Sequence, residues 1–508
     1  MSKSNTNRIA LNSLALYINM VVTMAVTLLG TRFVLQALGE ESYAVYALVA
    51  NIVALFSFLN VAMAGASQRY LSYYMGRNDG NNLNEIFYNS TIIHSAIALI
   101  SALLLLATGI PAIEYWLEIP DGLKGEATIV LLCMIGGVVL TVTSVPYEAT
   151  MNAHEDITRI ALINILDALC KLSSAIAVMF IPSNRLTVYA LLIMCSATVA
   201  FYCKRIYSKK NYRETHFEWH KVKDIALLRQ MMGYAGWNLI GNGCSIARYQ
   251  GAAILLNSFF GLAYNAGYGI SQQVNGFLMF FANSAVRPMR PHIIKSEGAG
   301  LHDKMIEHSF SASRLTSILL AAAMIPLYIN MPFVLEVWLG GNIPAGALEF
   351  CRGFLVITLI GQLTIGQQLA LESVGKIKRQ HIVLGAMHLL PLLCALLLFS
   401  MGLQYYYIIF CIIAEELLCI AVRTYIAKKD AGIPVRTFIT THLLPCSASI
   451  AVAFIASYYA ARFFDGSITK LVTSTATSTV LLAVSAFAIC FTKSEKEKIQ
   501  SLLQRSRR

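Results

Sequence analysis

An arginine stands in the middle of Asn238–Gly261, an otherwise apolar stretch with the length of a membrane-spanning helix. Arg248 has no acidic residue within four positions on that helix. A cation at such a helix centre costs about 2.5–3.5 kcal/mol on insertion scales, so it must face water, a counter-ion or a substrate. A guanidinium donates in parallel to two oxygens of one phosphate. Arg248 is therefore our first candidate for binding an anionic group.

Other charges also lie inside apolar runs. Lys171 follows Asp167 by four positions, so the two side chains can neutralise each other on one helix face. This pair is either an ion-coupling site or a structural pair.

Glu415 and Glu416 are adjacent, and adjacent residues do not share a helix face. We therefore expect one of them, with Glu415 as the candidate, to bind a coupling ion and the other to lie near the membrane interface.

Soluble-enzyme and metal chemistry have little support in the sequence. The eleven cysteines fall almost entirely in apolar runs, with no C-x-x-C spacing and no companion histidines, so they need no metal or disulfide. His94 and His388 are lone histidines that we interpret as packing residues. The chain lacks the phosphate-binding loop of an ATPase, and His154-Glu155 lacks the second histidine of a zinc protease. We expect no enzyme activity, no metal and no cofactor.

Membrane helices must position these residues. Hydrophobic residues make up 57% of the 508-residue chain and charged residues only 13%, which excludes a soluble domain of this length. About fourteen apolar runs of roughly 17 to 25 residues recur along the chain. The first run is too long for a signal peptide and has no cleavage site after it, so we expect it to be retained.

Lysine and arginine positions predict the topology. With a cytoplasmic N-terminus, 31 of the 39 basic residues lie in inside segments and 6 in outside segments. This bias follows the positive-inside rule and places both termini in the cytoplasm. It also accounts for the net charge of +12, so we infer contact with anionic membrane lipids and no binding to nucleic acid.

A faint direct repeat organises the chain. At an offset of 222 residues, Leu38-Gly39 matches Phe260-Gly261, and Glu114–Leu117 matches Glu336–Leu339. An aromatic anchor placed independently at each outer interface would also explain the second match. If the repeat is real, two lobes of like orientation surround a central substrate path. The predicted organisation is an N-terminal lobe at 1–208, a basic cytoplasmic linker at 209–229, a C-terminal lobe at 230–430, and two further helices with a basic tail at 431–508.

Polar residues inside the spans are candidates for lining that path. Near the chain centre, Asn265, Tyr268, Gln272 and Asn275 follow at steps of three, four and three, which places them on one helix face. For any single Asn or Gln, hydrogen bonding between helices is the competing explanation. Arg32 and Arg69 lie near the ends of the first two spans, where they either meet a headgroup or snorkel to the interface. The predicted substrate-binding set is Arg248, Arg32, Arg69, Asn19, Asn60, Tyr268, Gln272 and Asn275.

Five segments together resemble a known family, namely Thr31–Val49, Gln68–Arg77, Val145–Asp156, Gly236–Leu262 and Asn283–Glu297. They look like the polysaccharide or O-antigen (Wzx-type) flippases of the multidrug/oligosaccharidyl-lipid/polysaccharide (MOP) exporter superfamily. The resemblance covers nearly all of the first twelve spans, through many weak positions and no single diagnostic motif. It implies an all-α membrane protein with two six-helix lobes in a V-shaped, MATE-like arrangement. Arg248 falls where the seventh span of this family commonly carries a basic residue.

The same resemblance implies a function. Such a protein moves an oligosaccharide linked to undecaprenyl diphosphate across the bacterial inner membrane by alternating access, for O-antigen, capsule or exopolysaccharide synthesis. Na⁺ or H⁺ coupling stays open, and a polysaccharide polymerase with its chain-length machinery is the expected partner. A cation-coupled drug antiporter of the same superfamily is the alternative, although it would place acids where this chain has an arginine. A membrane glycan polymerase or transferase is less favoured, because the outer links are short.

Overall fold

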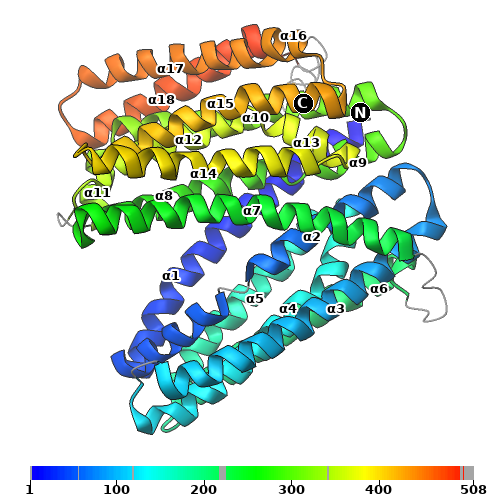
Figure 1. Cartoon of the computed structure of the whole chain (residues 1–508), viewed down its shortest axis with the longest axis vertical. Helices are drawn as coiled ribbons and strands as arrows, with labels where there is room; N and C mark the ends of the chain where they lie inside the picture. The colour runs from blue at the N-terminus through cyan, green and yellow to red at the C-terminus, as the bar shows by residue number, and fades with distance from the viewer. Residues whose placement is uncertain are drawn as a thin grey trace, which may run out of the picture. The chain divides into compact units, whose positions relative to one another are not determined.

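The computed structural model describes residues 3–54, 57–116, 119–216, 225–339, 343–491 and 496 (Figure 1). Helices and short turns make up this part of the chain, and no strand occurs in it. Long apolar runs favour this outcome, because a helix satisfies its backbone N–H and C=O groups internally when lipid offers no partners. The all-α prediction is confirmed.

The chain divides into two compact units. Unit 1 is Met1–Leu239 with Ile294–Gly300, and unit 2 is Ile240–Ile293 with Leu301–Arg508. The division falls inside helix α7 (Ile225–Phe260), which begins within the predicted linker and continues beyond it. Residues 217–224 of that linker lie outside the described residues. So do residues 492–495 and 497–508 of the predicted basic tail.

Unit 1 is built from six long helices, and α5 packs on α1 while α4 packs on α2, α3 and α6. Its core is apolar and includes Val49, Leu105, Leu131 and Leu186. The helices are α1 (Lys3–Ala54), α2 (Ser57–Gly76), α3 (Gly80–Pro111), α4 (Asp121–Ala153), α5 (Ile157–Val178) and α6 (Arg185–Asn211), with the short turns η1 (Ala112–Trp116) and η2 (Arg213–Thr215).

Unit 2 contains the helices from α10 on, together with α8, the part of α7 after Leu239 and the part of α9 before Ile294 (Figure 1). Within it, α10 packs against α12, α13, α17 and α18. The paired helices α17 and α18 hold the two spans expected after the second lobe. The elements after α7 are α8 (Leu262–Val286), α9 (Arg290–Gly298), α10 (His302–Ile329), α11 (Met331–Leu339), α12 (Ala347–Gln362), α13 (Ile365–Val374), α14 (Lys378–Ser400), α15 (Tyr407–Ala431), α16 (Val435–Phe438), η4 (Ile439–Leu443), α17 (Leu444–Arg462), α18 (Ser467–Ser485) and η5 (Ala486–Cys490).

Two glycines break long helices with the same backbone conformation. Gly39 interrupts α1 at φ 78° and ψ 170°, and Gly261 separates α7 from α8 at φ 84° and ψ −176°. This region of φ and ψ is open essentially only to glycine. The two positions are the pair aligned by the sequence repeat, so the repeat has a structural counterpart in each unit.

Small residues bring α7 close to α14. A Cβ atom added at Gly241 would lie 1.9 Å from Nδ1 of His381, and one at Gly251 would lie 2.6 Å from a methyl carbon of Leu392. From α14, a Cβ at Gly385 would lie 3.2 Å from the sulfur of Cys244. Close approach through small residues is typical of helix packing in membranes. It sets the distance from α7 to the helix that carries His388.

Eight helices in the described residues are long and apolar enough to cross a membrane, and the bent pair of α12 and α13 makes a ninth. They are α3 to α6, α10, α14, α17 with its preceding turns, and α18 with η5. Helices α7 and α8 contain 36 and 25 residues, which is sufficient length for a span. Asn, Gln and Gly residues lower the hydropathy of α7 and α8, so neither helix is among the eight. Polar candidates for the substrate path were predicted in these same two helices.

Candidate functional site

Arg248 lies buried in unit 2, with 3% of the residue exposed. Its Nη1 donates to Oε2 of Glu415 at 2.5 Å and to Oε1 of Glu416 at 2.8 Å. Of water, a counter-ion and a substrate, Arg248 therefore faces counter-ions. No acid lies within four positions on its own helix, and both carboxylates come from α15, more than 160 positions further along the chain.

Both glutamates belong to this cluster, although we expected the two adjacent residues to have different surroundings. Glu415 and Glu416 are 3% and 7% exposed and contact the same guanidinium nitrogen. Adjacent Cα–Cβ bonds diverge by about 100° around a helix of 3.6 residues per turn. The two glutamate side chains are long enough to converge on one guanidinium nitrogen from these different directions.

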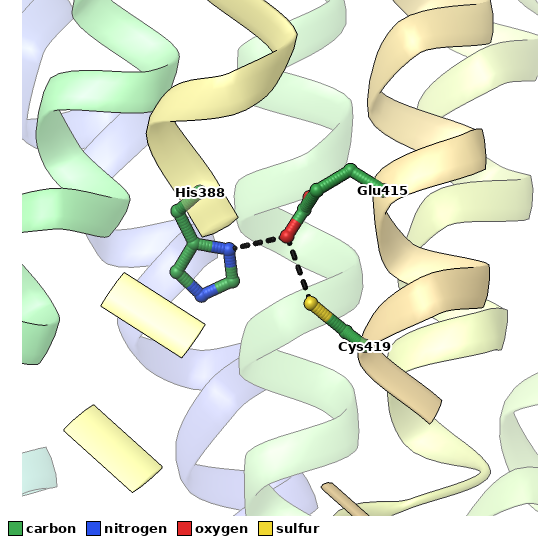
Figure 2. A group of neighbouring side chains, drawn as sticks. All are labelled: His388, Glu415 and Cys419. Carbon is green, nitrogen blue, oxygen red and sulfur yellow. Dashed lines mark hydrogen bonds and ion pairs between the residues drawn. The ribbon is translucent and has the colours of Figure 1, made fainter. Parts of the chain in front are cut away.

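The second oxygen of Glu415 has its own partners (Figure 2). Oε1 of Glu415 lies 2.8 Å from Nδ1 of His388 and accepts a hydrogen bond from Sγ of Cys419 at 2.9 Å. His388 comes from α14, and Cys419 lies four positions after Glu415 on α15. Our interpretation of His388 as a packing residue, and of the cysteines as lacking histidine neighbours, was wrong here. With neutral imidazole and thiol, these side chains and the Arg248–Glu416 pair sum to a charge of −1.

The polar face of α8 connects helices within unit 2. The Tyr268 hydroxyl donates to the backbone oxygen of Tyr249 at 3.3 Å, and Nε2 of Gln272 donates to the Tyr268 hydroxyl at 3.0 Å. Further along α8, Oδ1 of Asn275 accepts from the Thr358 hydroxyl of α12 at 2.7 Å. Tyr268 and Asn275 therefore make hydrogen bonds between helices, which was the competing explanation, whereas Gln272 bonds to Tyr268 within α8.

Tyr249 links that stripe to the charged cluster. Its hydroxyl accepts from Nη2 of Arg248 at 3.0 Å, and the guanidinium carbon lies 4.8 Å from the centre of its ring. The predicted residues Arg248, Tyr268, Gln272 and Glu415 thus form one connected network. Glu416, His388, Cys419 and Tyr249 complete the network but were absent from the predicted set. The i, i+4 spacing of Glu415 and Cys419 was the one local signal for them.

Unit 1 holds the other predicted residues. Arg69 is 8% exposed and lies over three tyrosine rings, at 4.7 Å from Tyr70, 5.0 Å from Tyr73 and 5.5 Å from Tyr234. Asn19 is buried in α1, whereas Arg32 of the same helix is exposed. The Asn60 side chain in α2 lies outside the described residues.

The predicted pair of Lys171 and Asp167 forms on α5, with 2.7 Å between Nζ and Oδ2. The Ser196 hydroxyl of α6 donates to the other carboxylate oxygen at 2.5 Å. Lys171 also lines a groove of about 360 Å³ between α1, α4, α5 and α6. The remaining lining is mainly apolar and includes Val53, Met134 and Ile193. One cation therefore borders an apolar channel within unit 1.

The fold is that of the MATE transporters, which are multi-pass membrane proteins. A MATE protein in the bent conformation matches with a TM-score of 0.72, over 84% of this chain and 97% of its own. An outward-facing multidrug resistance MATE family transporter of the MOP superfamily matches at 0.67, over 84% and 96%. A MOP superfamily transporter from Pyrococcus furiosus, described by the reverse polarity of its binding pocket, matches at 0.70, over 86% and 97%.

Each of these structures is 12% identical to this chain. The expected MATE-like fold is therefore confirmed, and the likeness at this identity concerns the fold alone. No protein-family profile and no curated protein matches the chain.

Proposed function

We propose that this protein is a flippase that moves an oligosaccharide linked to undecaprenyl diphosphate across the bacterial inner membrane by alternating access. The product would serve O-antigen, capsule or exopolysaccharide synthesis, with both termini of the chain in the cytoplasm. The observation that carries this proposal is Arg69, a buried cation set against aromatic rings in unit 1. The expected partners are membrane lipids and the polysaccharide polymerase with its chain-length machinery.

Arg69 suits an anionic headgroup by its geometry. The guanidinium carbon lies 4.7 and 5.0 Å from the centres of the Tyr70 and Tyr73 rings, which hold the cation in place, and its N–H donors lie at the edge of the guanidinium plane. Such an edge can donate in parallel to two phosphate oxygens. Because a diphosphate carries two negative charges or more, it gains from a cation held away from bulk water. Exposed Arg32 would receive the headgroup nearer the surface.

The groove beside Lys171 supports a substrate with an apolar chain. Its apolar lining fits an isoprenoid, while the ammonium group of Lys171 fits a phosphate at the end of that chain. Within unit 1, Asn19 and Asn60 would contact the glycan. Arg248 has a changed role in this proposal, because two carboxylates already occupy Nη1. It donates to the Tyr249 hydroxyl and holds that side chain beside the charged cluster.

A drug antiporter is the second candidate. The buried acids Glu415 and Glu416 favour it, since cationic drugs and coupling cations both need negative charge. One of the structural neighbours is described as a multidrug resistance transporter. In this reading Arg248 holds the two acids in place until a cation enters.

Proteoliposomes distinguish the two candidates. We expect the purified protein to exchange fluorescent undecaprenyl diphosphate oligosaccharide between leaflets, and to leave a cationic dye such as ethidium untransported. Arg69→Gln should lower lipid exchange about tenfold or more, and Arg69→Lys should restore part of it. Arg77→Gln is the matched control, because Arg77 directly follows α2, is exposed and lies over the ring of Tyr74. Dye transport without lipid exchange would establish the antiporter instead.

A further inference from the structure

We propose that His388, Glu415 and Cys419 form a binding site for a soft divalent transition-metal ion, with Zn²⁺ as the natural candidate. The ligand atoms Nδ1, Oε1 and Sγ all lie within 4.8 Å of one another. Figure 2 shows the His388 ring and the Cys419 sulfur directed at one carboxylate oxygen of Glu415. The inference concerns ion binding and does not depend on what the protein transports.

The helices place these ligands by simple geometry. Glu415 and Cys419 are four residues apart on α15, so their side chains lie one above the other on the same face. Helix α14 packs against α15 and contributes His388 to that face. Two ligands from one helix and a third from its neighbour are thus fixed by helix packing before any ion arrives.

The donor types decide which ion fits. Imidazole nitrogen and thiolate sulfur favour Zn²⁺ or Co²⁺, whereas Ca²⁺ and Mg²⁺ prefer sites made of oxygen atoms. Three protein ligands leave the fourth tetrahedral position open to water or another donor. Such a site exchanges its ion more readily than a closed four-cysteine site.

The distances between the donor atoms show that hydrogen bonds hold these side chains close together before an ion binds. Oε1 of Glu415 is 2.8 Å from Nδ1 and 2.9 Å from Sγ. Ligands at about 2.0–2.3 Å from a tetrahedral zinc stand about 3.5 Å apart. Replacing the two bridging protons by an ion therefore requires each of these two distances to grow by roughly 0.6–0.7 Å.

The charges favour uptake of a divalent ion. Arg248, Glu415 and Glu416 together carry −1 when the imidazole and the thiol are neutral. Binding of the ion adds +2, the Cys419 thiol loses its proton to solvent, and the imidazole proton moves from Nδ1 to Nε2. The cluster then sums to zero, and one proton is released for each ion bound.

The surroundings leave this position available. Arg248 contacts the other carboxylate oxygen, Oε2, so it fixes the orientation of Glu415 without covering Oε1. Glu415 and Cys419 are buried, whereas the His388 side chain is 13% exposed. An ion would therefore enter past His388.

Spectroscopy with Co²⁺ tests the site on the full-length, tag-free protein in detergent micelles. We expect one equivalent of Co²⁺ to produce a thiolate-to-cobalt charge-transfer band, and Zn²⁺ to displace it. Cys419→Ser should abolish the band, and His388→Gln should weaken binding more than about tenfold. Cys411→Ser, a half-buried cysteine two turns earlier on α15, is the control and should keep the band.

Thermal unfolding keeps the test decisive if a variant is unstable. Zn²⁺ should raise the melting temperature of the wild type and of Cys411→Ser, but leave that of Cys419→Ser unchanged. A wild type without a saturable cobalt band would overturn the proposal. A band that survives both Cys419→Ser and His388→Gln would overturn it as well. Neither result depends on the lipid-exchange assay.

Discussion

Arg248 and Glu415 stand 167 positions apart in the chain and meet in a buried ion pair, 2.5 Å between Nη1 and Oε2. Glu416 completes the pair to a triad from the next position of α15. Buried ion pairs contribute little net stability, but removing one partner leaves an uncompensated charge. A test of the role of Arg248 therefore measures the stability of a variant before its transport activity.

Arg248→Met should destabilise the protein strongly, because two carboxylates lose their common partner. We expect a loss of about 3–5 kcal/mol, and a triple variant with Glu415→Gln and Glu416→Gln should regain most of it. Melting curves of the detergent-solubilised protein measure both effects. The reaction of the buried cysteines with a fluorescent maleimide monitors unfolding. A variant that melts like the wild type but fails in lipid exchange would instead make Arg248 a direct substrate contact.

Gly39→Ala and Gly261→Ala should each cost about 1–3 kcal/mol, because an alanine is strained at their φ and ψ angles. No heavy atom lies within 4 Å of a Cβ added at either position, so crowding does not contribute. Gly243→Ala within α7 is the control. It has equal room and should be neutral or slightly stabilising, since alanine is the better helix former. The same melting assay reports all three, and equal losses for all would contradict this account.

The contact of His154 with Glu214 in unit 1 predicts a pH dependence. Burial raises the pKa of Glu214, but the hydrogen bond with His154 at 2.6 Å, a backbone hydrogen bond and the attraction of His154 together outweigh burial and leave the pKa below its ordinary value of 4.5. Its contribution to stability is therefore present above pH 4.5 and is lost as the pH falls through the folded pKa.

Glu214→Gln should accordingly lower stability by about 1 kcal/mol near neutral pH, a modest value because His154 is partly exposed. The difference from the wild type should shrink below pH 4.5, in melting curves recorded from pH 3 to 7. The exposed Glu41 offers a control, and Glu41→Gln should show little difference at any pH. A difference that grows on acidification would be the wrong sign.

Lys171→Gln separates a structural pair from a substrate contact. The Lys171 side chain is 48% exposed, so loss of its pair with Asp167 should change stability by less than about 1 kcal/mol. If the groove accepts the lipid carrier, exchange of undecaprenyl diphosphate oligosaccharide should fall several-fold in the same proteoliposomes. Unchanged exchange would leave the pair a structural one.

The features predicted well from sequence depend on local or averaged properties. Composition and run length predict a helical membrane protein, and the i, i+4 spacing predicts the pair of Lys171 and Asp167. The partners of Arg248 could not be found in this way, because tertiary packing alone decides which face of α15 meets α7. His388 shows the same limit. It lies 27 residues from Glu415 in the chain, and the approach of α14 to α15 makes it a neighbour.

The matching helix breaks at Gly39 and Gly261 also bear on the evolutionary history of the chain. Essentially only glycine adopts this conformation. Acquiring it independently at two matching places would therefore require two separate, matched changes in the sequence. Duplication of a half-length gene, whose product already had this glycine conformation, would yield both glycine positions in one step.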